Sequence, residues 1–161
     1  MRRRLLATIA ALGIVGALVA TATPALAQAP KFHRADSSVA DDAALVVTFD
    51  ERGLGNEDID YVLSADGEAT YACFNRGGKN PSATNKRTVS QEVSQEATFE
   101  PRNGRVQASI EAGPPSPGDF RCPSGQRMEL IDVSYTNVVL TDTTNDVSTS
   151  VEDASRTFRD A

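Results

Sequence analysis

The feature that most constrains the fold of this chain is a two-residue alternation of apolar and polar side chains. Between residues 105 and 111, Val106, Ala108 and Ile110 alternate with charged or polar residues, and residues 59–64 follow the same period. Such spacing is typical of a β-strand with one buried face and one wet face. No window of the chain shows a sustained helical period. The sequence therefore predicts an all-β protein.

Turn-forming residues divide the chain into short strands. Asp66-Gly67 and Asn103-Gly104 are typical of tight hairpin turns, because glycine accepts the positive φ that these turns require. Within 128–140 the apolar face changes near Ile131-Asp132, which indicates a β-bulge. Strands are expected at 44–49, 59–64, 69–75, 88–93, 97–100, 105–111, 128–140 and 147–151. Seven or eight short strands favour a single antiparallel β-sandwich domain over residues 43–161.

The expected architecture is immunoglobulin-like. Tyr71-Ala72-Cys73 matches the tyrosine-x-cysteine pattern of immunoglobulin domains, where it marks the second cysteine and a buried Trp packs on the bridge. Here the pattern sits at the first cysteine, and the chain has no Trp. We therefore expect the architecture without membership of that superfamily.

The N-terminus has the three parts of a secretory signal peptide. Three arginines follow Met1, residues 5–20 are apolar or small, and an Ala-x-Ala site ends at Ala27. The apolar run has roughly 16 residues, whereas a membrane-spanning helix needs about 20. We expect cleavage of residues 1–27, secretion, and no membrane attachment afterwards. Residues 28–42 are polar and small and are expected to form a flexible leader.

The chain contains two cysteines, Cys73 and Cys122. In an exported protein an isolated pair most simply forms one disulfide. The bridge would close a loop of about 50 residues and stabilise the fold by roughly 4 kcal/mol in the chain-entropy model. A metal site is the weaker interpretation, since two thiols without a nearby His provide half of a zinc site at best.

The exported chain is acidic. Three of the 16 Lys and Arg residues, and none of the 22 Asp and Glu residues, lie in the signal peptide, which leaves a net charge of about −9. Phosphate contacts need clustered cations, so nucleic acid is not an expected partner. We expect a monomer, because acidity of this kind mostly keeps proteins soluble and separate.

Few residues point to catalysis. His33 is the single histidine and lies in the predicted leader, where it cannot be held as a base against a nucleophile. Two carboxylates placed in a cleft would still allow a carboxylate-based enzyme. The expectation is a protein without enzymatic activity, with an enzyme of that kind as the third hypothesis.

Calcium is the one metal that the residue types suggest. Asp142, Asn145 and Asp146 are weak candidates in a predicted turn, and a second group of acids occupies residues 50–60. Hard oxygen ligands suit calcium, but neither segment has the EF-hand spacing. We expect solvated acidic turns, no bound metal and no cofactor.

Two loops are the candidate contact surfaces. The segment 76–87 is expected to be a long positive loop, and 113–118 is rich in proline and glycine. The candidate interaction residues are Arg76, Lys79, Lys86, Arg87, Pro114, Pro115 and Pro117.

Three segments, 69–73, 77–81 and 134–145, resemble a group of small secreted β-rich proteins of actinobacteria. The resemblance covers about residues 44–158. It implies an exported β-rich protein and carries over no catalytic or binding residue.

The leading functional hypothesis is a secreted, non-enzymatic binding or interaction domain at the cell surface or in the medium, with an extracellular protein or cell-wall partner. The alternative is a secreted protease inhibitor that presents the Pro-rich loop 113–119. Proline and a nearby bridge would preorganise that loop and lower the entropy cost of binding.

Overall fold

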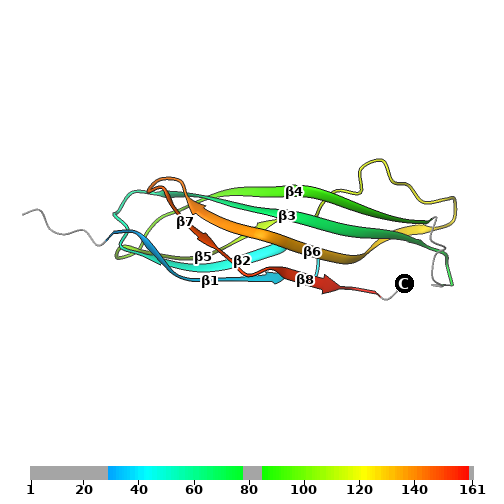
Figure 1. The fold of residues 1–161 in the computed structure, drawn as a ribbon, viewed down its shortest axis with the longest axis horizontal. Coiled ribbons are helices and arrows are strands. Elements are labelled where there is room, and N and C mark those ends of the chain that lie inside the picture. The colour runs from blue at the N-terminus through cyan, green and yellow to red at the C-terminus, as the bar shows by residue number, and fades with distance from the viewer. Residues whose placement is uncertain (1–28, 78–84, 160–161) are drawn as a thin grey trace, which may run out of the picture.

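The computed structural model describes residues 29–77 and 85–159, and it forms an elongated sandwich of two antiparallel sheets (Figure 1). The strands are β1 (Lys31–Val39), β2 (Leu45–Arg52), β3 (Ile59–Phe74), β4 (Lys86–Phe99), β5 (Arg105–Ala112), β6 (Arg127–Asp142), β7 (Val147–Ser150) and β8 (Ala154–Thr157). The predictions of an all-β class, two packed sheets and about eight strands are therefore confirmed.

The two sheets differ in strand number and in length. The three-stranded sheet has the order β1-β2-β5, and the five-stranded sheet has the order β4-β3-β6-β7, with β8 also paired to β6. β3 and β6 have 16 residues each, whereas β2 and β5 have eight. The long strands therefore extend past the end of the three-stranded sheet.

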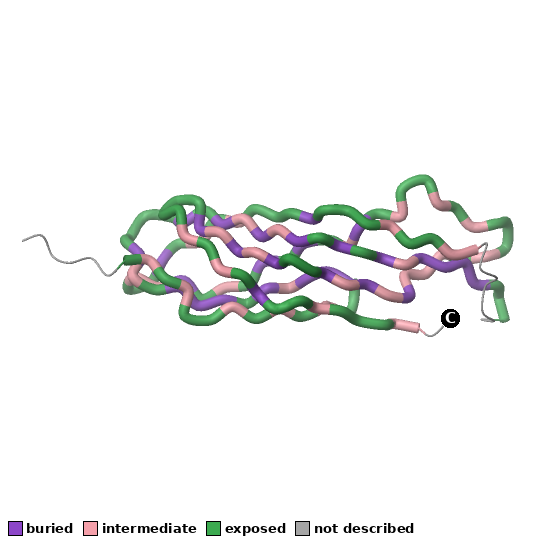
Figure 2. Tube along the Cα trace, viewed as in Figure 1, coloured by how far each residue is buried: buried purple, intermediate pink, exposed green. Residues whose placement is uncertain are grey.

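The core lies between the sheets and follows the two-residue period of the strands. Leu45, Val47 and Phe49 of β2 face Tyr61 and Leu63 of β3, and all five are buried. Figure 2 shows buried positions concentrated along β2, β3 and β6, whereas most residues of β4 are exposed.

Where the three-stranded sheet ends, the segment 113–126 covers the inner face of β3. Pro115 is fully buried and its carbonyl accepts a hydrogen bond from the Tyr71 hydroxyl at 2.6 Å. Cys73 and Cys122 form a disulfide that ties this segment to the end of β3, with Cα atoms 5.5 Å apart. The predicted disulfide is confirmed.

The expectation of a flexible leader over residues 28–42 is wrong. Residues Lys31–Val39 form β1, which pairs along its length with β2. Its sequence alternates poorly, and only Phe32, Ala35 and Val39 pack partly against the core. Backbone pairing with β2, which propensity does not reveal, determines this strand.

The expected hairpin at Asp66-Gly67 is also wrong. β3 runs through both residues, which pair with Glu92 and Gln91 of β4 and with residues of β6 on the other side. Ladders on both edges outweigh the local turn preference. The expected strands 88–93 and 97–100 are likewise one continuous strand, β4.

The predicted bulge is confirmed, whereas the Asn103-Gly104 segment forms the predicted tight turn but not the predicted hairpin. The register between β3 and β6 shifts where Ile131 is passed over between Leu130 and Asp132, which is the predicted bulge. Asn103 and Gly104 have positive φ, as a tight turn there requires, and Arg102 and Arg105 exchange backbone hydrogen bonds across them. This turn joins the two sheets rather than two paired strands.

The predicted signal peptide lies in residues 1–28, outside the described residues, and stays a prediction. Over residues 29–77 and 85–159, no helix has the length and apolar character needed to cross a bilayer.

Candidate functional site

An arginine cluster on the outer face of the three-stranded sheet is the candidate site. Arg34 comes from β1, Arg52 from β2 and Arg105 from β5. Arg34 pairs in register with Asp50, and Arg52 pairs with Arg105. The three strands therefore bring together arginines that are 18 to 71 positions apart in the sequence. We call these three residues the arginine cluster.

Asp50 organises two of the three arginines. Arg105 donates from Nε at 2.6 Å and from Nη2 at 2.7 Å, and Arg52 donates from Nη2 at 2.8 Å to the same carboxylate. These contacts hold the pKa of Asp50 well below its usual range. One charged carboxylate thus fixes two guanidinium groups in forked geometry.

The guanidinium groups keep access to solvent while they are held. The side chain of Asp50 is 12% exposed, whereas those of Arg105 and Arg52 are 38% and 48% exposed. Arg34 is more exposed still and pairs with Asp36 beside it. The exposed N–H groups of the cluster are therefore available to a negatively charged ligand.

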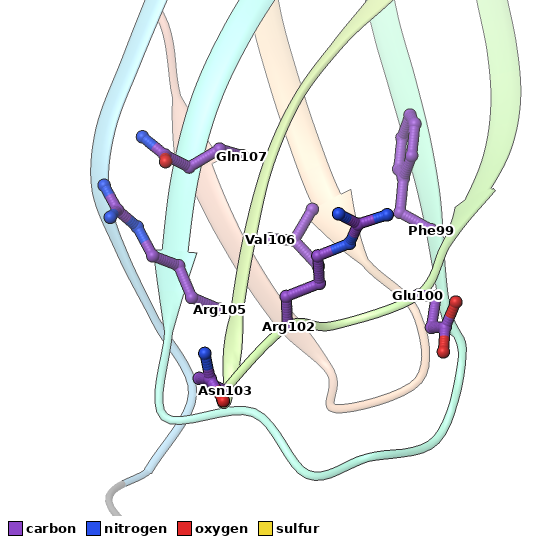
Figure 3. Close-up of a pocket in the computed structure, with 7 residues that line it drawn as sticks. All are labelled: Phe99, Glu100, Arg102, Asn103, Arg105, Val106 and Gln107. Carbon is purple, nitrogen blue, oxygen red and sulfur yellow. The ribbon is translucent and has the colours of Figure 1, made fainter.

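Shallow hollows surround the cluster on several sides. One on the sheet face is lined by Arg34, Asp50 and Arg105, and another by Arg52, Gly53 and Arg105. A third opens between β4 and β5 (Figure 3), where Arg102 extends across toward Phe99. Lys31 and His33 line a fourth beside Arg52. The linings of these four hollows hold five Lys and Arg side chains and three carboxylates, those of Asp36, Asp50 and Glu100.

The predicted positive loop 76–87 is only partly a loop. Arg76 is exposed in a turn after β3, but Lys86 and Arg87 begin β4, and Lys79 lies outside the described residues. Lys86 and Arg87 do not belong to the arginine cluster. The cluster lies at the opposite end of the sandwich, where β4 ends and β3 begins. Whether these residues contact a partner stays a prediction.

The Pro-rich segment lies at the same end as Arg76. Asn85 donates to the Gln126 side chain at 3.3 Å, and the disulfide joins the same two regions. Pro115 is buried, Pro114 and Pro117 are half-buried, and Ser116, Gly118 and Asp119 are exposed. The sequence placed all three prolines in a presented loop, whereas in the structure Pro115 packs on the sheet.

The groups considered for catalysis are dispersed. His33 lies on the exposed surface of β1 rather than in a leader. Glu51 and Asp142 do come together, but both are fully buried in the core. A substrate in solution therefore cannot contact Glu51 or Asp142 in this structure.

The weak calcium candidates make contacts with each other. The Asp142 carboxylate accepts hydrogen bonds from the backbone N–H of Asn145 at 2.9 Å and from its side-chain amide at 2.7 Å. Asp146 is exposed. Within the described parts of the chain, no group of three or more His, Cys, Asp or Glu side chains is placed to hold a metal ion.

The sequence did not reveal the arginine cluster for two reasons. Arg34 lay in the expected leader, and nothing in the sequence paired residue 52 with residue 105. A usable signal existed in Asp50 and Arg52, which are two residues apart and so lie on one face of a strand.

Comparison of the chain with protein-family models, with curated proteins and with solved structures gives no match in any of the three.

Proposed function

We propose that this protein is a secreted, non-enzymatic binding domain whose contact surface is the arginine cluster, and that it binds a partner through carboxylate or phosphate groups. The observation that carries the proposal is the convergence of Arg52 and Arg105 on Asp50. A planar guanidinium matches the two oxygens of a carboxylate or a phosphate. Asp50 occupies the Nε/Nη2 edge of both side chains, so a ligand anion would bind at their Nη1/Nη2 edges.

Preorganisation strengthens this argument. Free arginine side chains lose rotamer freedom when they bind a ligand, and that loss opposes affinity. Here Asp50 already restricts Arg52 and Arg105 in the unbound protein. A ligand anion therefore meets oriented donors, and Arg34 adds a third cation on the same face.

The proposed extracellular location is supported by two features. The disulfide between Cys73 and Cys122 suits an oxidising compartment. The first 27 residues have the pattern of a signal peptide. An extracellular protein or a cell-wall component that carries negative charge is the corresponding partner.

The test uses calorimetric titration of the purified protein with two probes, polyphosphate and poly-L-aspartate. The double variant R34Q/R105Q removes two guanidinium groups and keeps the Arg52–Asp50 contact. The expected result is binding by the wild type and at least about tenfold weaker binding by the variant, with a further loss as salt is raised.

A matched control removes the same type of charge elsewhere. Arg121 lies in the 113–126 segment, where its guanidinium contacts backbone carbonyls of Gly118 and Phe120. R121Q should bind both probes as the wild type does. Absence of binding by the wild type, or equal weakening in R121Q and R34Q/R105Q, would rule out the cluster as the contact surface.

The protease-inhibitor alternative stays a prediction. Burial of Pro115 leaves residues 116–119 as the part of the loop that a protease could reach. Incubation with subtilisin and trypsin tests it, and prompt cleavage without loss of protease activity would end it.

A further inference from the structure

β4 is a long edge strand that lacks two of the usual protections against pairing, proline and a β-bulge. It has 14 residues, forms an uninterrupted ladder with β3, and contains no proline and no bulge. No strand in the described parts of the chain pairs with its other edge. The unpaired N–H and C=O groups of such an edge are a template for another strand.

The other edges of the sandwich are better protected. β7 and β8 have four residues each, and β1 has a register irregularity between Phe32 and Arg34. β5 is also a free edge, but it has only eight residues. β4 is the topmost labelled strand in Figure 1, and the connection between β5 and β6 rises above its right-hand part.

We infer that β4 pairs antiparallel with β4 of a second copy of this chain, with Gln91 opposite itself, and joins two five-stranded sheets into one. This inference concerns a different surface from the arginine cluster and does not depend on it.

Charge favours a second copy as the partner, and charge together with the length of the ladder favours this register. Lys86, Ser90, Glu92 and Glu96 share the outer face of β4, since they pair with even-numbered residues of β3 that lie on that face. With Gln91 opposite itself, Lys86 lies across from Glu96 of the second copy, and the symmetry repeats this pair. Opposite charges at facing positions stabilise a sheet, whereas like charges destabilise it.

One other register keeps a match of this kind: placing Val89 opposite itself brings Lys86 across from Glu92. That register pairs only residues 86–92 of each strand, whereas the register with Gln91 opposite itself pairs residues 86–96. The remaining registers lose the match. In an antiparallel pair, residues opposite each other lie on the same side of the sheet. The allowed registers therefore differ only in which residue of β4 lies opposite itself. Placing Glu92 opposite itself brings two carboxylates together, and placing Ser94 opposite itself brings Glu92 against Glu96. Placing Ser90 opposite itself leaves Lys86 across from a serine. Placing Val93 opposite itself moves the partner of Lys86 beyond Phe99, the end of the strand.

The inner face of β4 fits the same register. Val93 is buried and Val89 is half-buried, and these two residues would face each other across the new ladder. Gln91 would face Gln91, whose amide groups can donate to and accept from each other. The apolar strip of the core would thus continue from one copy into the other.

Sedimentation equilibrium of the purified protein without residues 1–27 tests the inference. The wild type should show a reversible dimer. K86E and E96K should each weaken the dimer about tenfold or more, because each creates two like-charge pairs, and K86E/E96K should restore it by exchanging the charges. E111K reverses an exposed carboxylate on β5 and should leave the dimer constant unchanged.

Cross-linking gives a second and independent readout of the register. Under mild oxidation Q91C should form a covalent dimer, since this position faces itself, whereas Q95C should not, because it faces Arg87 of the second copy. A wild type that stays monomeric at millimolar concentration overturns the inference. So does failure of the charge exchange to restore the dimer, or cross-linking of Q95C in place of Q91C.

Discussion

Glu51 of β2 and Asp142 of β6 meet in the core with no solvent exposure on either residue. The Tyr61 hydroxyl donates to one Glu51 carboxylate oxygen at 2.8 Å, while the other oxygen, Oε1, has no hydrogen-bond partner among the described residues. Asp142 accepts two hydrogen bonds from Asn145. Burial first, and then the charge and proximity of Asp142, raise the pKa of Glu51 to about 7. Glu51 is therefore protonated at pH values below about 7.

The first prediction is a loss of stability as the pH rises through 7. The folded-state pKa of Glu51 is raised above the ordinary value of 4.5, so its contribution is complete below pH 4.5 and is lost as the pH rises through about 7. The full effect is on the order of 3 kcal/mol. Urea unfolding at pH 5, 7 and 9 should show this decline, and E51Q should flatten it and be the more stable protein at pH 9.

The control for this prediction is E57Q, which neutralises an exposed glutamate in the loop after β2. Its stability should follow the wild type across the range. A wild type whose stability is constant from pH 5 to pH 9 would show that the pKa of Glu51 is not raised.

The second prediction concerns the close approach of Gly67 and Pro115. A Cβ atom at position 67 would lie 2.7 Å from Pro115 Cγ and 3.3 Å from the Gln91 carbonyl oxygen. G67A should therefore displace the buried proline and destabilise the protein by about 1–3 kcal/mol. G55A is the matched control, since a Cβ there meets no atom within 4 Å. Equal unfolding midpoints for G67A and the wild type would contradict the packing of Pro115 on β3.

Gly67 also shows why part of the fold could not be predicted. Its sequence context favours a hairpin turn, but the residue lies in a strand paired on both edges. Pro115 packs where a Cβ atom of residue 67 would lie. Local preference cannot report ladders to residues 91 and 135, which are distant in sequence. The strands around Ile110 and Leu140 could be predicted because their own alternation matches their burial.

The candidate site was harder to predict than the fold for the same reason. Arg34, Arg52 and Arg105 meet only through the register of three strands, one of which, β1, has too few apolar residues to be recognised. The disulfide could be predicted because a chain with two cysteines allows a single pairing.

The third prediction is that the disulfide holds the 113–126 segment on the inner face of β3. Replacing both cysteines with alanine should cost about 2–5 kcal/mol, because the bridge closes a long loop between residues 49 positions apart. Amide hydrogen exchange should rise first at the non-proline residues of the 113–126 segment and around Tyr71, while β2 and β5 keep their protection. Uniform loss of protection across both sheets would contradict a local role for the bridge.

The last prediction separates the structural role of Asp50 from that of the other acids. Its pKa is held well below the usual range by hydrogen bonds from Arg105 and then from Arg52. A lowered pKa contributes stability above the ordinary value of 3.8, and that stability is lost as the pH falls through the folded-state pKa. D50N removes the charge that both arginines contact, so it should unfold at lower urea concentration than the wild type at pH 6. The difference should shrink as the wild type is acidified below pH 3.8.

D119N, at an exposed aspartate in the 113–126 segment, should match the wild type. A D50N protein as stable as the wild type at pH 6 would show that Arg52 and Arg105 are not held by this carboxylate.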